Sequence, residues 1–154
     1  ILSRAHDTVI QGGLGSSTVR SLVGQMLAVH EDPDEPRFSV NGPEIHVGSR
    51  PALSLSLILH ELATNAVKYG ALSTPNGRID ISWRVVEAER ENFEFVWQET
   101  GGPPVCLPDR EGAGSRLIKA GVSGVTCSKV TVLYEPSGLR CNVVADLRTF
   151  QQDH

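Results

Sequence analysis

The sequence has few cysteines and no pattern that would pair them. Its three cysteines, Cys106, Cys127 and Cys141, are widely spaced, include no C-x-x-C pair and are odd in number. Isolated cysteines in an odd number indicate neither a disulfide framework nor a zinc site. Because this usage is typical of a reducing compartment, we expect a cytoplasmic protein.

Long hydrophobic runs and a surplus of basic charge are also lacking. The longest apolar stretch, Leu53–Leu62, is interrupted by Ser54, Ser56, His60 and Glu61, so it is too short and too polar to cross a bilayer. The 14 Lys and Arg residues against 18 Asp and Glu give a net charge of −4. No global basic field is therefore available for nucleic acid or an anionic membrane. We expect neither as a partner, and any phosphate must be bound locally.

What the chain does have is an ordinary globular composition. It is 40% hydrophobic and 21% charged over 154 residues, which argues against disorder and against a fibrous repeat. The length fits one domain, and we expect residues 1–154 to form it. The sequence does not begin with Met, so we also expect it to be part of a longer protein.

The first predicted helix covers residues 17–29, where apolar residues recur on one helical face. Ser16 or Ser17 can serve as its N-cap. Two short strands are predicted next, Arg37–Asn41 and Glu44–Val47, and the Asn-Gly pair between them is typical of a hairpin turn. We expect this hairpin at the edge of a sheet.

A second, longer helix is predicted at about residues 50–69. The alternation in Leu53–Leu57 would also suit a strand, but the length of the apolar pattern favours a helix. Ser49 stands at the cap position, Pro51 suits the first turn, and Gly70 suits a left-handed residue after the last turn.

Alternation with period two predicts four further strands. They are Arg78–Val86, Asn92–Glu99, Lys129–Tyr134 and Leu139–Leu147. Between the second and third, the Gly- and Pro-rich residues 100–114 are predicted to form a loop, and Ser115–Ala120 a short helix. Strands mixed with a few helices predict an α+β fold, a two-layer α/β sandwich in which a mixed, mostly antiparallel sheet packs on helices.

Three polar residues of the longer helix share one stripe of its surface. Glu61, Asn65 and Lys68 are spaced at i, i+4 and i+7. An Asn carboxamide oxygen, with a nearby Glu that organises coordinated water, is a set that Mg²⁺ accepts. Lys68 would add positive charge for a phosphate. The alternative is a solvated helix face that binds nothing.

Glycines supply a second candidate site. Gly101 and Gly102 follow a predicted strand, and Gly112, Gly114 and Ser115 open the predicted short helix. Backbone N–H groups at such a turn and at a helix N-terminus can bind an anion without net positive charge. The spacing matches neither the Walker pattern nor the dinucleotide fingerprint, so those two nucleotide folds are disfavoured.

The strand at 92–99 predicts a third feature. Its alternation places Phe93, Phe95, Trp97 and Glu99 on one side, so a carboxylate ends an apolar wall. A carboxylate accepts from the exocyclic amine of adenine and repels the carbonyl of guanine. The alternatives are a strand-end glutamate in water and, for Trp97, a packing role in the core rather than contact with a nucleotide.

Three ordered segments resemble the HWE histidine kinases. Residues 60–73 are similar to the asparagine box of that family, and residues 97–105 are similar to its W-x-E glycine box. Residues 112–118 are similar to the second glycine box, although Ala113 stands where the family usually has an aromatic residue. The resemblance runs from about Ala5 to Leu147.

This resemblance implies the catalytic, ATP-binding domain of a bacterial two-component sensor histidine kinase, with the Bergerat-type fold of the GHKL superfamily and with ATP and Mg²⁺ as cofactors. By this similarity Asn65 would ligate Mg²⁺, Glu61 would act in catalysis by holding the metal's water shell, and Lys68 would face phosphate. Tyr69 would pack on the nucleotide and Glu99 would read adenine.

Two further assignments follow from the same resemblance. His60 supplies the first family letter and is a catalytic candidate, although it lies beside the metal stripe; the alternative is a hydrogen-bonded structural histidine. The residues 100–114 would form the ATP lid. The candidate nucleotide contacts in and next to this lid are Gly101, Gly102, Gly112, Gly114 and Ser115.

A histidine kinase of this kind phosphorylates a histidine on a separate dimerising hairpin, and no pattern of such a hairpin precedes the first predicted helix. The implied partners are therefore the phosphoacceptor hairpin of a parent kinase and, through it, a response regulator. We expect the chain to bind Mg·ATP without phosphorylating itself. Two alternatives remain, an anti-sigma-type protein serine kinase with the same nucleotide site and a nucleotide-gated binding module without phosphoryl transfer.

Overall fold

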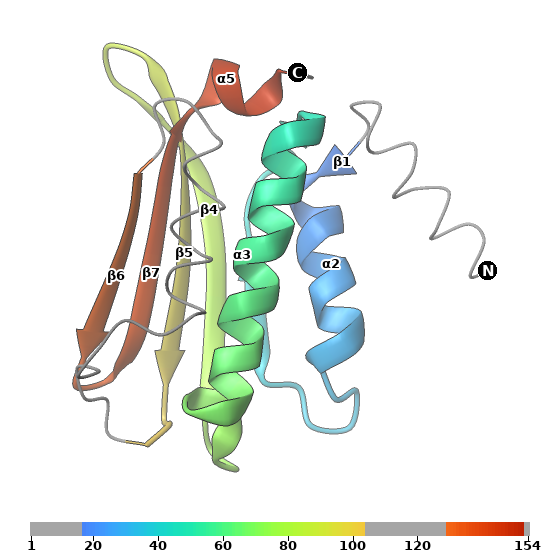
Figure 1. Ribbon diagram of the computed structural model, residues 1–154, viewed down its shortest axis with the longest axis vertical. Helices are drawn as coiled ribbons and strands as arrows, with labels where there is room; N and C mark the ends of the chain where they lie inside the picture. The colour runs from blue at the N-terminus through green and yellow to red at the C-terminus, as the bar shows by residue number, and fades with distance from the viewer. Residues whose placement is uncertain (1–16, 104–128, 153–154) are drawn as a thin grey trace, which may run out of the picture.

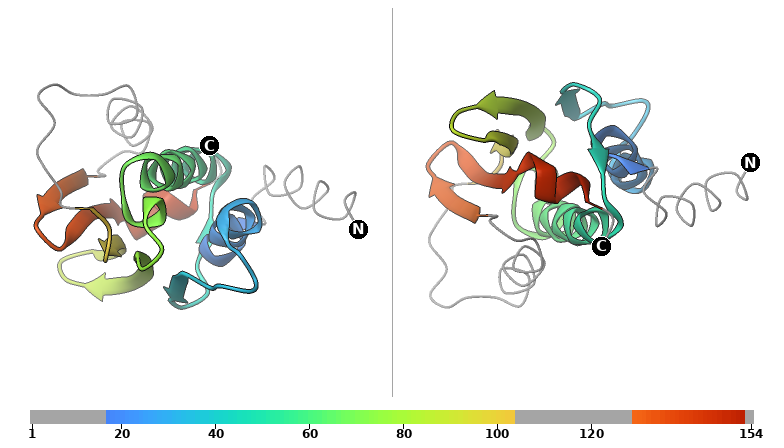
Figure 2. Two further views of the ribbon diagram at one scale, coloured as in Figure 1. Left: turned by 90° about the horizontal axis from the view of Figure 1, so that it is seen from below. Right: turned by 90° about the horizontal axis from the view of Figure 1, so that it is seen from above.

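The computed structural model describes residues 17–103 and 129–152. Helices α2 (Val19–His30) and α3 (Ser49–Lys68) lie side by side against one face of a five-stranded sheet, as Figures 1 and 2 show. This arrangement confirms the predicted α+β class and its two layers. Over the described ranges, no helix combines the length and apolar character needed to cross a bilayer.

The sheet is mixed and mostly antiparallel, as predicted. Its strands in spatial order are β2 (Phe38–Asn41), β4 (Arg78–Glu87), β5 (Glu91–Thr100), β7 (Gly138–Asp146) and β6 (Lys129–Glu135). Only the β2–β4 pair of this sheet is parallel. The ends of β4 to β7 agree with the predicted strands to within one residue. A period-two pattern predicts strands this closely because α2 and α3 cover one face of the sheet, while the other face is more accessible to solvent.

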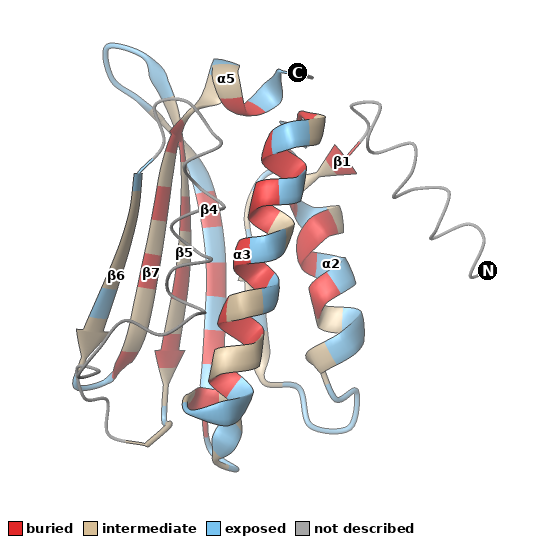
Figure 3. Ribbon diagram, in the orientation of Figure 1, coloured by how far each residue is buried: buried red, intermediate tan, exposed pale blue. Residues whose placement is uncertain are grey.

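The covered face of the sheet supplies the core. On β5 the side chains of Phe93, Phe95 and Trp97 are fully buried, and on β4 buried and exposed residues alternate (Figure 3). The predicted packing role of Trp97 is thereby confirmed. The apolar side chains of α2 and α3 complete the same core.

The predicted hairpin at Arg37–Asn41 and Glu44–Val47 is wrong. β2 lies parallel to β4, and β3 (His46–Val47) pairs antiparallel with β1 (Ser17–Thr18). The reason is Trp83, whose indole occupies the space where a side chain on Gly42 would lie and donates a hydrogen bond to the Pro43 carbonyl at 2.7 Å. The chain after β2 is held against Trp83, so it does not fold back on itself.

The N-cap of α2 is Thr18, not Ser16 or Ser17. The Thr18 hydroxyl accepts a hydrogen bond from the Ser21 N–H at 3.1 Å, and the Ser21 hydroxyl oxygen accepts one from the Thr18 N–H at 3.0 Å. This reciprocal pair satisfies two backbone donors at the helix start. Ser17 is instead paired in β1, and Ser16 lies outside the described residues.

The ends of α3 also differ from the prediction. Gly48 is its N-cap and makes no side-chain capping bond, while Ser49 is the first helical residue. Pro51 lies in the first turn, as expected. Gly70 has φ −115°, so it is not left-handed. The need for glycine at position 70 has another origin, described with the site below.

A short C-terminal helix was not expected from the sequence. The strand predicted to reach residue 147 ends at Asp146, and Leu147–Gln151 form α5. The Asp146 carboxylate accepts hydrogen bonds from the N–H and hydroxyl of Thr149, both at 3.0 Å, and these bonds lower the pKa of Asp146. Phe150 then stacks on Phe93 with ring centroids 4.2 Å apart, which closes this end of the core.

We expect Phe150→Ala to lower the free energy of unfolding by about 3–5 kcal/mol, because it removes a buried aromatic ring and leaves a cavity. Chemical denaturation measures this loss, and Gln151→Ala, an exposed change in the same helix, is the matched control. Equal unfolding midpoints for Phe150→Ala and the wild type would mean that α5 is not part of the folded core.

Candidate functional site

Glu99 is the one charged side chain that is buried among the described residues, with 4% of its surface exposed. The alternation of β5 places it on the core face after Trp97, as predicted, and the alternative of a glutamate in water is wrong. One carboxylate oxygen, Oε1, accepts the Ala71 N–H at 2.9 Å, and the other, Oε2, accepts the Trp97 indole N–H at 3.0 Å.

The protonation of Glu99 is set by two opposing influences. Burial raises the pKa of Glu99, while the hydrogen bonds from Ala71 and Trp97 lower it, and the net direction is upward. Both partners are N–H groups that can only donate, so they favour the ionised carboxylate. A carboxylate accepts about four hydrogen bonds, and capacity therefore remains for a ligand.

The segment after α3 approaches this carboxylate closely. The chain passes through Gly70 into the short 3₁₀ helix η2 (Ala71–Ser73), and a Cβ atom on Gly70 would lie 2.2 Å from Glu99 Oε1. Glycine is therefore required at position 70 because a carboxylate occupies the side-chain space. The expectation of a left-handed residue located the glycine but gave the wrong reason for it.

Arg37 is a residue of this site that the sequence reasoning missed. Its guanidinium donates hydrogen bonds to the carbonyl oxygens of Ala71 at 2.6 Å, Gly77 at 2.9 Å and Thr74. One side chain thus holds the whole 71–77 turn in place. No sequence signal could have found this role, because the acceptors are backbone carbonyls that every residue carries.

The predicted glycine pair packs against the same turn. Gly101 has φ +72°, and a Cβ there would lie 2.6 Å from the Asn76 carbonyl oxygen. A Cβ on Gly102 would lie 2.9 Å from the backbone of Ala71. The structure thus brings Gly101, Gly102 and Glu99 together around the 71–77 turn. The other predicted lid residues, Gly112, Gly114 and Ser115, lie outside the described residues.

The predicted Mg²⁺-binding residues Glu61, Asn65 and Lys68 lie on the part of α3 that leads into Gly70 and the 71–77 turn. Asn65 and Lys68 are in the last turns of α3, and Glu61 is one turn earlier. The side chains of Glu61 and Asn65 are half-buried, whereas those of Lys68 and Tyr69 are exposed. Their side chains make no hydrogen bond or ion pair within residues 17–103 and 129–152. In the same ranges, no group of three or more His, Cys, Asp or Glu residues is arranged so that it could hold a metal ion. An Asn oxygen with one nearby carboxylate fits Mg²⁺, which takes few protein ligands beside phosphate and water.

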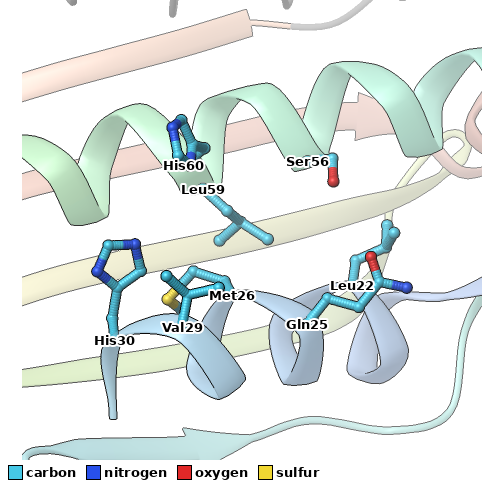
Figure 4. A pocket seen from close by; sticks show the side chains of 8 residues that line it. All are labelled: Leu22, Gln25, Met26, Val29, His30, Ser56, Leu59 and His60. Atoms are coloured by element: carbon cyan, nitrogen blue, oxygen red, sulfur yellow. The ribbon is translucent and has the colours of Figure 1, made fainter. Parts of the chain in front are cut away.

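His60 lies elsewhere. It is exposed on the side of α3 that faces α2, and its ring centroid is 6.4 Å from that of His30. Both imidazoles line a cavity of about 140 Å³ between the two helices, with Leu22, Met26 and Leu59 (Figure 4). Burial and the neighbouring His60 lower the pKa of His30. The structure therefore brings His60 together with His30 and not with Glu99.

We expect Gly70→Ala to lower the free energy of unfolding by about 1–3 kcal/mol, because the added methyl group displaces the Glu99 carboxylate. Gly24→Ala is the matched control, since nothing lies within 4 Å of a Cβ there. In the middle of α2 this change should instead stabilise by about 0.5–1 kcal/mol. Denaturant titration of both variants gives the signs, and a stabilising Gly70→Ala would contradict the close approach.

Comparison with known proteins shows relatives of one kind. The chain is 40% identical over 147 residues to a blue-light-activated histidine kinase of Brucella anthropi, and 37% identical over 147 residues to one of Brucella ovis. Each match covers 95% of this chain and 30% of the relative. The chain thus spans less than a third of the length of these relatives. No family model matches it.

Solved structures show the same fold. A histidine kinase domain from a blue-light activated histidine kinase of Erythrobacter litoralis has a TM-score of 0.60 at 17% identity, covering 86% of this chain and 64% of that one. A histidine kinase of Acinetobacter baumannii has a TM-score of 0.63 at 16% identity, covering 94% and 74%. These likenesses confirm the predicted two-layer sandwich fold. The chain is thus similar in sequence to a part of these histidine kinases and has the fold of solved histidine kinase structures.

Proposed function

We propose that this domain binds Mg·ATP and transfers the γ-phosphoryl group to a histidine on a dimerising hairpin of a parent sensor kinase of the HWE type. The observation that carries the proposal is Glu99, a buried acceptor at the junction of β5, the end of α3 and the 71–77 turn. The 40% identity to a histidine kinase supports it. A cytoplasmic location and a downstream response regulator belong to the same proposal.

The proposed base contact uses the remaining acceptor capacity of Glu99. Adenine carries an exocyclic amine, which donates a hydrogen bond, where guanine carries a carbonyl, which cannot. A buried carboxylate that faces a carbonyl is left unsatisfied, at a cost of about 1–3 kcal/mol. We therefore expect ATP to bind more tightly than GTP.

The proposed phosphate end of the site is the last part of α3. The Asn65 carboxamide oxygen would ligate Mg²⁺, and Glu61 would act in catalysis by orienting the metal's water shell. Bound Mg²⁺ supplies the positive charge that phosphoryl transfer requires. Lys68 would meet a phosphate and Tyr69 would pack on the nucleotide. The backbone N–H groups of the lid complete the proposed cradle, from Gly101 and Gly102 through to Gly112, Gly114 and Ser115.

In the proposed reaction the domain positions ATP and excludes water, and an imidazole nitrogen of the hairpin attacks the γ-phosphorus as ADP leaves. Catalysis of this kind depends on placing the nucleophile in line and on neutralising charge. His60 stays a weaker candidate for a catalytic role, because its contact with His30 across α2 and α3 favours a role in helix packing.

We expect Asn65→Ala to weaken Mg·ATP binding by about 2–3 kcal/mol, the size of a lost bond to a charged group, which is roughly 30- to 150-fold. Affinity for ATP in the presence of a chelator should change little, because only the metal contact is removed. Calorimetric titration with and without Mg²⁺ measures both values. Asn41→Ala, an exposed change at the end of β2, is the control, and equal Mg-dependent affinity in both variants would refute the ligand assignment.

We expect radiolabelled ATP to leave this chain unlabelled and to label the hairpin of its parent kinase when the two are mixed. Labelling in trans should be weak, because the tether that raises effective concentration is lost. Acid-labile phosphohistidine supports the proposal. Acid-stable phosphoserine on a partner would indicate an anti-sigma-type kinase instead, and binding without any label a nucleotide-gated module. Strong self-labelling that His30→Ala abolishes would place the acceptor within this chain.

A further inference from the structure

We propose that Trp97 and Arg37 are positioning residues that hold the Glu99 carboxylate as a hydrogen-bond acceptor, and that they thereby determine the preference for adenine, which presents an amine to Glu99, over guanine, which presents a carbonyl at the same ring position. This inference rests on the proposed ATP site. It adds to that site two residues that need not touch the nucleotide.

Trp97 acts on Glu99 directly. Its side chain is fully buried, and its indole N–H donates to Glu99 Oε2 at 3.0 Å from two residues earlier on the same face of β5. The ring of Phe38 packs edge-on against it, with centroids 6.1 Å apart and planes at 69°. A ring packed in this way keeps its N–H aimed at one place. A purely apolar residue would fill the same core volume without a donor.

Arg37 acts on Glu99 through the backbone of Ala71. The Ala71 N–H donates to Glu99 Oε1 at 2.9 Å, and the Ala71 carbonyl accepts from the Arg37 guanidinium at 2.6 Å. Arg37 is itself fixed by its bond to Gly77. Arg37 therefore fixes, through the Ala71 carbonyl, the residue whose N–H is the second donor to Glu99. Without that clamp the turn, and with it the Ala71 N–H, is free to move.

The two N–H donors influence whether the Glu99 carboxyl is ionised, and therefore accepts hydrogen bonds, or protonated, and therefore donates one. Burial raises the pKa of Glu99, and the two N–H bonds are what oppose that rise. Among the described residues, the charged side chains next to Glu99 in the sheet point away from it: Asp80 and Arg140 flank Gln98, and Gln98 alternates to the opposite face. Lys68, at the end of α3, is exposed. Loss of one donor therefore favours the protonated carboxyl.

A protonated carboxyl has the wrong polarity for an amine. Its O–H is a donor, so it can bond the carbonyl of guanine instead of accepting from the amine of adenine. Removing the Trp97 donor should therefore relax the preference for ATP over GTP. The loss should be greatest at low pH and should reverse as the pH rises above the pKa of Glu99. If Trp97 served only in packing, its replacement would weaken the binding of ATP and GTP equally at every pH.

The test compares Trp97→Phe with Trp83→Phe. Trp83 is also a buried tryptophan of this sheet, but its indole donates to the Pro43 carbonyl. Affinities for Mg·ATP and Mg·GTP are measured by calorimetry from about pH 5 to about pH 9, a range that covers the raised pKa values of buried carboxyls. The pKa of Glu99 in the nucleotide-free protein is followed by carboxyl carbon-13 NMR. Glu99→Gln, which cannot titrate, gives the reference profile.

We expect Trp97→Phe to raise the pKa of Glu99 and to lose most of the ATP preference at low pH, while Trp83→Phe keeps the wild-type profile and Glu99→Gln shows a flat one. Arg37→Gln should shift the pKa in the same direction by less, because Arg37 acts through Ala71. If Trp97→Phe left the pKa of Glu99 and the ratio of ATP to GTP affinity unchanged, the positioning role would be overturned, whereas the proposed ATP site would not be affected. A wild type that binds neither nucleotide would overturn both proposals.

Discussion

A carboxylate removed from water must be hydrogen-bonded, and this requirement organises the end of the domain where Glu99 lies. The period of β5 carries Glu99 into the core, so two N–H donors are drawn to it, one from Trp97 and one from Ala71. The backbone then comes so close that only glycine fits at position 70. The turn that supplies Ala71 is in turn held by Arg37. The position of Gly70, the turn that carries Ala71 and the proposed base contact all depend on this one buried carboxylate.

The parts of the fold that could be predicted are those whose cause is local in the sequence. Alternation located β4, β5 and β7 because along most of each strand buried side chains alternate with more accessible ones. The hairpin at Asn41 failed for the opposite reason, since its Asn-Gly signal is local whereas Trp83, which diverts the chain, is distant in the sequence. The sequence does not predict helix α5 because five residues are too few to show a helical period, and only the contact of Phe150 with Phe93 explains it.

The candidate site divides in the same way. Glu99, Asn65 and the glycine pair could be named as candidates from the sequence because the proposed chemistry belongs to their side chains or to the lack of one. Arg37 could not, because it bonds to carbonyl oxygens that leave no mark in a sequence. The pairing of His60 with His30 was likewise invisible, since it depends on how α2 and α3 pack. Sequence identifies functional groups, while the backbone contacts that hold them emerge only in three dimensions.

The placement of the two described chain ends has a mechanical consequence. β1 pairs with β3, and the Gly48 N–H, just before α3, donates to the Phe150 carbonyl in α5, so residues 17 and 150 lie near the start of α3 (Figure 1). The proposed nucleotide contacts lie at its other end, and a helix of 20 residues is about 30 Å long. Residues 17 and 150 and the proposed nucleotide contacts are thus separated by about the length of α3. Over that length, a rotation of about 10° about the start of α3 would move its far end, and with it the proposed site, by about 5 Å.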